Sequence, residues 1–174
     1  MLAENLSGLF QRHLELAYDD EQHMAKELPK MIAAGSSAHF RDALEQSLEQ
    51  NKVHQERFDQ VFASLKRASG TETDHAIRNL MSETEKLIKH IDRSPLLDSA
   101  LIIVLNQAGH NQIARYGALV SLARLQGLGE AETLLTQMLA DKKTTDQTFT
   151  ELAIKLVNPE AVGFQNSPPR YVII

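Results

Sequence analysis

The chain has no cysteine and no tryptophan, and aromatic residues make up only 5% of its 174 residues. Without cysteine, neither a disulfide nor thiolate chemistry is available to it. No stretch approaches the roughly 18 consecutive apolar residues that a membrane span needs. The first residues, Met1 to Glu4, lack the basic start and apolar run of a signal peptide. We therefore expect a cytoplasmic protein, although a chain without cysteine is also compatible with an oxidising compartment.

The net charge, the composition and the length of the chain restrict the class of protein further. The net charge of −5 argues against a nucleic-acid binder, because affinity for phosphate needs clustered Lys and Arg. A hydrophobic content of 43% and a charged content of 24% are typical of soluble globular proteins. The length suits one domain, whose core must consist mostly of Leu, Ile, Val, Met and Ala.

The spacing of apolar residues predicts an all-α fold. Steps of three and four residues predict four long amphipathic helices, over about residues 2–34, 38–68, 95–126 and 128–157. A shorter helix is expected over about residues 73–91, and Ser94 with Pro95 is typical of a helix start. No segment alternates as a strand does. A short helix in the crossover between the second and third long helices is typical of a ferritin-like four-helix bundle.

The C-terminal residues are expected to form an extended tail rather than part of the helical bundle. Asn158-Pro159 is expected to end the last long helix, which gives a helical bundle over residues 1–157 and an extended tail over residues 158–174. Pro168-Pro169 favours extended backbone, and the last residues, Tyr171 to Ile174, are apolar. The tail either folds back on its own bundle or hangs loose, or it docks on a protein partner.

Each helix has one core-facing row of apolar residues, and polar or small residues interrupt every row near its middle. These interruptions are Glu21 in the first row, Ser47, Asn51 and His54 in the second, Gly109 and Gln112 in the third, and Lys142 and Thr145 in the fourth. Polar groups inside a bundle are costly unless they are paired. A bundle interior is also where cofactor and metal sites are built.

Short motifs in order along the chain resemble the YciE/YciF family of ferritin-like proteins, the DUF892 domain. They are Leu16-Ala17-Tyr18-Asp19 with Glu21-Gln22, Leu28-Pro29-Lys30-Met31, Ile113-Ala114-Arg115-Tyr116-Gly117, and Thr144-Thr145-Asp146 with Thr150-Glu151-Leu152-Ala153. The resemblance covers about residues 2–153. It implies a ferritin-like bundle, usually a homodimer, in a bacterial family that is linked to stress responses and has no settled activity.

The resemblance also identifies an interior site that is degenerate in this chain. Family members with a full two-metal site carry carboxylates at positions that correspond here to Glu21, Gln50, Gly109, Gln112 and Lys142. Only Glu21 keeps the carboxylate, so the resemblance alone does not carry the metal chemistry over to this chain.

The charges in the core-facing rows also lead us to expect no two-metal site. Two divalent ions bring four positive charges into a low-dielectric interior, where carboxylates must offset them. The rows offer one negative group, Glu21, and one positive group, Lys142. We expect these two to form a buried ion pair, with Gln50, Gln112 and His54 satisfying the remaining hydrogen bonds and Gly109 making room for the Lys142 stem. The alternative is that Lys142 reaches the surface and Glu21 is solvated.

A single His54 is expected to be structural, because one imidazole does not hold a metal. His110 should face away from the bundle centre, and Glu49, Asp141 and Asp146 are expected to be solvated. No phosphate loop, nucleophile elbow or His-Glu-x-x-His motif is present, so no catalytic residue is assigned.

The sequence therefore predicts a metal-free, dimeric ferritin-like protein with a structural or interaction role in stress, without a cofactor and with the tail as a candidate contact for a protein partner. The alternative is an iron- or manganese-dependent oxidase or oxygen-scavenging protein, whose rearranged ligands would be Glu21, Glu49, His54 and Asp141 or Asp146.

Overall fold

The computed structural model describes residues 5–70 and 72–165, which are helical almost throughout and contain no strand. The helices are α1 (Leu6–Ala34), α2 (Ala38–Ser64), α3 (His75–His90), α4 (Pro95–Leu125), α5 (Gly129–Leu152), a π-helical turn (Ala153–Val157) and α6 (Asn158–Gln165). None of the described helices combines the length and the apolarity that crossing a membrane requires. The prediction of an all-α fold is confirmed for the described part of the chain.

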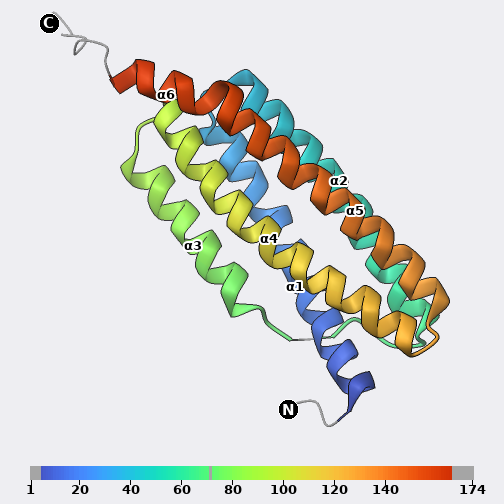
Figure 1. Ribbon diagram of the computed structural model, residues 1–174. Coiled ribbons are helices and arrows are strands. Elements are labelled where there is room, and N and C mark those ends of the chain that lie inside the picture. The colour runs from blue at the N-terminus through green and yellow to red at the C-terminus, as the bar shows by residue number, and fades with distance from the viewer. Residues whose placement is uncertain (1–4, 71, 166–174) are drawn as a thin grey trace, which may run out of the picture.

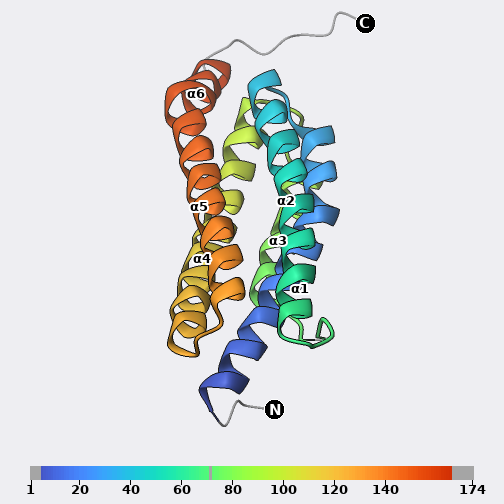
Figure 2. The same cartoon turned by 90° about the vertical axis from the view of Figure 1, so that its right-hand side faces the viewer.

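Four long helices pack side by side, and α3 lies against one side of the bundle (Figure 1). Helix α3 follows α2 in the chain and runs back along the bundle before α4 begins. The long helices α2 and α4 therefore point in the same direction, while α1 and α5 point the opposite way (Figure 1). Figure 2 shows α5 and α2 side by side on another face, with α6 continuing α5 at the end of the bundle where α2 begins. This is the predicted arrangement, with one crossover that contains a short helix.

Helix starts follow from capping residues. The Asn5 side chain accepts a hydrogen bond from the backbone N–H of Gly8 and caps α1. The Ser94 hydroxyl accepts from the N–H of Leu97, and Pro95 occupies the first turn of α4, where no N–H is needed. The predicted start of the third long helix is therefore confirmed.

Two predicted helix ends are wrong. Helix α2 ends at Ser64 rather than Ala68, because Lys66 adopts a left-handed backbone with φ of 53° and the N–H of Arg67 then bonds to the carbonyl of Phe62. Asn158-Pro159 does not stop the last helix. After the π-helical turn, α6 begins at Asn158 and keeps the chain helical to Gln165, because a proline in the first turn of a helix costs no hydrogen bond. The extended tail predicted from residue 158 is thus helical over 158–165, and its remainder, 166–174, lies outside the described residues.

The bundle core consists of two apolar halves. One half lies toward the loops at the α1–α2 turn and includes Met31, Phe40 and Leu101. The other lies toward the α4–α5 turn and includes Phe58, Leu119 and Leu135. On every long helix, the residues that fall between the two halves are those that interrupt the predicted rows. The polar interruptions therefore lie at one level of the bundle, as a layer between two apolar cores.

Asp98 fastens α4 to the turn between α1 and α2. Its fully buried carboxylate accepts hydrogen bonds of 2.8 Å from the backbone N–H and the hydroxyl of Ser36 and from the N–H of Ser37. Hydrogen bonds to a charged group are among the stronger ones in proteins. They fix how far α4 can slide along α1 and α2, and so help to set the level at which the polar layer forms.

Candidate functional site

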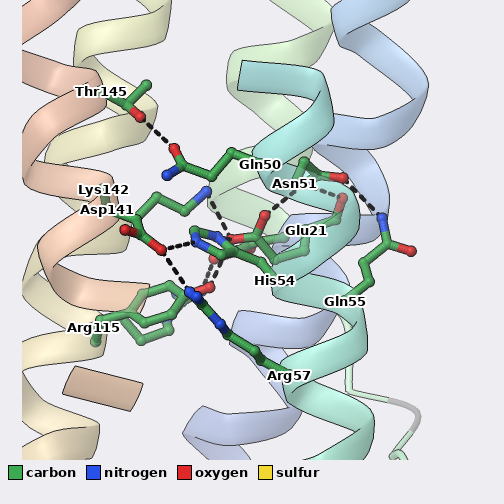
Figure 3. Close-up of polar contacts among 12 residues, drawn as sticks. Glu21, Gln50, Asn51, His54, Gln55, Arg57, Arg115, Asp141, Lys142 and Thr145 are labelled. Carbon is green, nitrogen blue, oxygen red and sulfur yellow. Dashed lines mark hydrogen bonds and ion pairs between the residues drawn. The ribbon is translucent and has the colours of Figure 1, made fainter. Parts of the chain in front are cut away.

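The centre of the polar layer is the side chain of Glu21, which comes from α1 and is completely buried. Figure 3 shows side chains from α2 and α5 converging on its carboxylate. We therefore treat Glu21 and its partners as the candidate site.

Three other helices supply hydrogen-bond donors to Glu21. The Tyr116 hydroxyl on α4 donates to Oε1 over 2.6 Å, and the Asn51 amide on α2 donates to Oε2 and to the backbone carbonyl of the same residue. The ammonium of Lys142 on α5 lies 2.7 Å from Oε1, with only 12% of its side chain exposed. The predicted buried ion pair of Glu21 and Lys142 is present. Both carboxylate oxygens are paired, as the burial of a charge requires.

These contacts control the protonation of the layer. Burial alone would raise the pKa of Glu21, but the Lys142 charge and the neighbouring His54 outweigh it and lower the pKa to about 2. Burial and the Glu21 carboxylate raise the pKa of Tyr116 well above its usual value. The carboxylate therefore stays ionised and the phenol keeps the proton that it donates.

His54 connects the buried carboxylate to the surface. Its ring is fully buried, with Nδ1 3.5 Å from Oε1 of Glu21 and Nε2 3.3 Å from Oδ2 of Asp141. Asp141 also pairs with Arg57 at 2.5 Å, and 31% of its side chain is exposed (Figure 3). Asp141 was expected to be solvated, and this is wrong, because the turn of α5 that points Lys142 inward also brings its neighbour onto α2.

The other residues of the predicted interior site are not bound to Glu21. The Gln50 carbonyl accepts a hydrogen bond from the Thr145 hydroxyl over 2.7 Å (Figure 3). Gln112 is buried, but its amide nitrogen has no hydrogen-bond partner in the described structure, so it does not satisfy the pair as expected. A Cβ at Gly109 would lie 3.5 Å from the Asp146 carboxylate, an ordinary van der Waals contact, and would not reach Lys142, so the expectation that Gly109 makes room for the Lys142 stem is wrong.

Of the alternative metal set, Glu21, His54 and Asp141 lie in one line of contacts, whereas Glu49 and Asp146 lie elsewhere. Glu49 is exposed and pairs with Lys52, and Asp146 pairs with the exposed His110 on the outside of α4. Asp146 is therefore not simply solvated, whereas His110 faces away from the centre as predicted. Within residues 5–70 and 72–165 no three His, Asp or Glu side chains are arranged to hold a metal ion. The donor set around Glu21, with a bound ammonium, does not fit a di-metal centre, which needs several carboxylates.

A second buried polar cluster, around Arg115, lies next to the Glu21 site and was not predicted. The Arg115 guanidinium on α4 pairs with the fully buried Asp20 on α1 and with Asp74, which precedes α3. Asp74 also caps α3 by accepting from the N–H groups of Ala76 and Ile77, and its own N–H donates to Asp19. This cluster attaches the crossover to the bundle. The spacing of residues gave no signal for it, because Asp20 is buried only through contacts with α4 and the start of α3.

The two carboxylates that share Arg115 differ in their protonation. Burial raises the pKa of Asp20 to about 8, although Arg115 acts to lower it. Asp74 is less buried. Burial raises its pKa, but Arg115 and the cap hydrogen bonds together lower it by more, so the net shift is downward. Near neutral pH, Asp20 thus holds a proton while Asp74 carries the charge.

Comparisons with known proteins agree with this architecture. The family model described as "Domain of unknown function (DUF892)" matches residues 5–162. The chain is 31% identical to protein YciF of Escherichia coli over 166 residues, which cover 92% of this chain and 98% of that protein.

Two solved structures are also similar. The crystal structure of the Escherichia coli stress protein YciF superposes with a TM-score of 0.85 at 30% identity, covering 90% of this chain and 99% of that one. YcfI of Rhodopseudomonas palustris, described as a candidate structural protein, gives 0.80 at 29% identity and covers 84% of this chain and 94% of that one. The fold predicted from the sequence, a ferritin-like bundle with a helix in the crossover, is confirmed.

The contribution of the buried pair is measurable by a double-mutant cycle. Lys142→Met should lower the free energy of unfolding by about 3–5 kcal/mol, because it strands the Glu21 carboxylate. The double variant Glu21→Gln with Lys142→Met should lose clearly less than the sum of the single losses. Lys143→Met, at an exposed neighbour on α5, should change stability by no more than about 0.5 kcal/mol. Urea unfolding gives all four values, and strictly additive losses would show that the two side chains do not interact.

The buried Asp20 predicts a dependence of stability on pH. Its pKa is raised to about 8 from an ordinary value of 3.8, so between these pH values the native state binds the extra proton and stability falls as pH rises. Asp20→Asn mimics the protonated form and removes this loss. The variant should match the parent near pH 4 and be the more stable protein at pH 8, while Asp59→Asn at an exposed position should follow the parent throughout.

Thermal or urea unfolding between pH 4 and pH 8 measures the difference for Asp20→Asn. A variant that is less stable than the parent at pH 8 would mean that Arg115 keeps Asp20 ionised, contrary to the expected proton.

Proposed function

The chain belongs to the DUF892 family, and from this premise we propose that it is a metal-free ferritin-like protein with a dimeric, structural or interaction role in stress. The observation that carries the proposal is the position of the Lys142 ammonium, 2.7 Å from the single carboxylate that the interior site retains. A divalent cation at this place would be repelled by the ammonium and held by too few anions.

The neighbouring groups support the same conclusion. The other carboxylate near the site, Asp141, is engaged by Arg57 at 2.5 Å and by His54 at 3.3 Å. Releasing it as a metal ligand would break both contacts and leave a guanidinium unpaired. The layer is therefore complete as a set of charges without a cation, and its chemistry is that of a structural element.

The relatives support the rest of the proposal only through their descriptions. YciF of Escherichia coli is described as a stress protein, and the Rhodopseudomonas palustris relative as a candidate structural protein. Neither description names a substrate, a cofactor or a partner.

A dimer is supported by an apolar surface over α4, the π-helical turn and α6. Ile103 and Ile154 are 60% and 66% exposed, and Val162 and Phe164 are more than half exposed. The Asn106 amide on α4 donates to the Thr150 hydroxyl on α5. Because these helices are antiparallel, Ile103 and Ile154, each about one turn from this contact in the same direction, lie near each other. Large exposed apolar side chains on neighbouring helices favour an interaction site, and we assign it to a second copy of the chain.

Metal analysis tests the central claim. The purified chain, incubated with Fe²⁺ or Mn²⁺ without oxygen and then desalted, should retain no stoichiometric metal by elemental analysis. Glu21→Ala should retain as little as the parent. One or two metal ions per chain in the parent, lost in Glu21→Ala, would overturn the proposal and favour the metal-dependent oxidase.

Light scattering during gel filtration tests the dimer. The parent should elute as a dimer, and Ile103→Glu with Ile154→Glu should be a monomer, because burying two carboxylates in an apolar interface is costly. Leu125→Glu, at the far end of α4 and 71% exposed, should stay dimeric. A monomeric parent would contradict the dimer, and a dimer lost only on deletion of residues 166–174 would move the interface to the tail.

A further inference from the structure

A pocket of about 180 Å³ opens between α2 and α5, next to the polar layer but apart from the Glu21 contacts. Its outer side shares Ala43, Gln46, Thr144 and Thr148 with a wide surface groove between the same helices. Its inner side shares Ser47, Thr145 and Phe149 with a cavity of about 30 Å³ that reaches Lys142. Three neighbouring spaces with shared wall residues thus follow one another from the surface toward the middle of the bundle, between the two helices that lie side by side in Figure 2.

The walls of the pocket are polar but uncharged. They consist of side-chain hydroxyl and amide groups, with Ala43 and Phe149 as apolar surface, and the polar members are Gln46, Ser47, Gln50, Thr144, Thr145 and Thr148. The Thr148 hydroxyl donates to the carbonyl of Thr144, and the Thr145 hydroxyl donates to Gln50. Their oxygen lone pairs and the Gln50 amide N–H remain to face a ligand.

The polar lining of the inner cavity includes two donors, Gln112 and Lys142, and the carboxylate of Asp146. The Gln112 residue is 2% exposed, lines the cavity, and has an amide nitrogen without a hydrogen-bond partner in the described structure. Lys142 lines the same cavity while its ammonium binds Glu21. A space of about 30 Å³ is the share of one water molecule in the liquid, so a single water or a ligand hydroxyl fits between these donors.

The lining selects among ligand classes. A charged ligand would lose its hydration in a pocket without a compensating charge, and an apolar one would leave the hydroxyl and amide groups unpaired. A molecule with several hydroxyl groups supplies donors and acceptors together and has apolar carbon faces for Phe149. The volume, equal to that of about six water molecules, limits it to a small one.

We propose that the pocket between α2 and α5 is a binding site for a small, uncharged polyol, with one hydroxyl group directed toward Gln112 and Lys142. The inner end of this site shares Lys142 with the Glu21 contacts and so rests on the proposed ion pair, but the site does not depend on the dimer, because the apolar surface does not line the pocket.

Titration of the full ¹⁵N-labelled chain with glycerol and with sorbitol, followed by NMR, tests the site. Saturable shifts are expected for the amides of Ser47, Thr145 and Phe149 and for the side-chain amide of Gln112. Thr145→Val removes one hydroxyl at constant shape and should weaken binding about tenfold, the equivalent of one well-formed hydrogen bond. Thr148→Val provides a second variant at the outer wall, should the first fail to fold.

Thr136→Val is the matched control for Thr148→Val. Both are exposed threonines of α5 whose hydroxyls donate to the carbonyl four residues earlier, but Thr136 lies outside the pocket. It should bind like the parent. Sodium acetate and 1-propanol, as charged and largely apolar molecules of similar size, should give no saturable shift at these amides. Linear shifts with both polyols, an equal response to acetate, or binding that both pocket variants leave unchanged would each overturn the proposal.

Discussion

A buried carboxylate is the constraint on which the middle of this bundle depends. Glu21 has no access to water, so each of the other three long helices must bring a donor to it: Tyr116 from α4, Asn51 from α2 and Lys142 from α5. Apolar rows alone would let the helices slide by a turn at little cost, whereas a shift of one turn here would leave a charge unpaired. We infer that the layer fixes the register of the helices, because only one register keeps its buried charges paired.

The main features of this layer were accessible from the sequence for a simple reason. Glu21 and Lys142 each lie in the middle of an apolar row, where burial is enforced by the residues one turn before and after. Opposite charges held at one level of a bundle have little alternative to pairing. The start of α4 was accessible for an equally local reason, because Ser94 and Pro95 act through their own backbone.

Features that depend on tertiary placement were missed. Asp20 lies beside the row, and its burial follows from α3 and α4 both covering α1, which no periodicity reveals. Asp141 and Asp146 were assigned to solvent because they flank a row, but the side of α5 that they occupy faces α2 and α4. Proline at 159 was interpreted as a stop, since sequence alone does not distinguish a residue after a helix from one in the first turn of the next.

The two sides of the polar layer differ in the charge of their side chains. On the Glu21 side, Lys142 balances the carboxylate and fills the space with a paired charge. On the side of α4 and the outer part of α2 lie Gly109, Gln112 and Gln50, which are uncharged, and the Gln112 amide nitrogen has no partner in the described structure. On the first side the anion is already balanced, which supports the proposal that this side takes no cation. The second keeps polar groups around a remaining space, and such a space suits a neutral hydrogen-bonding molecule better than an ion or a hydrocarbon.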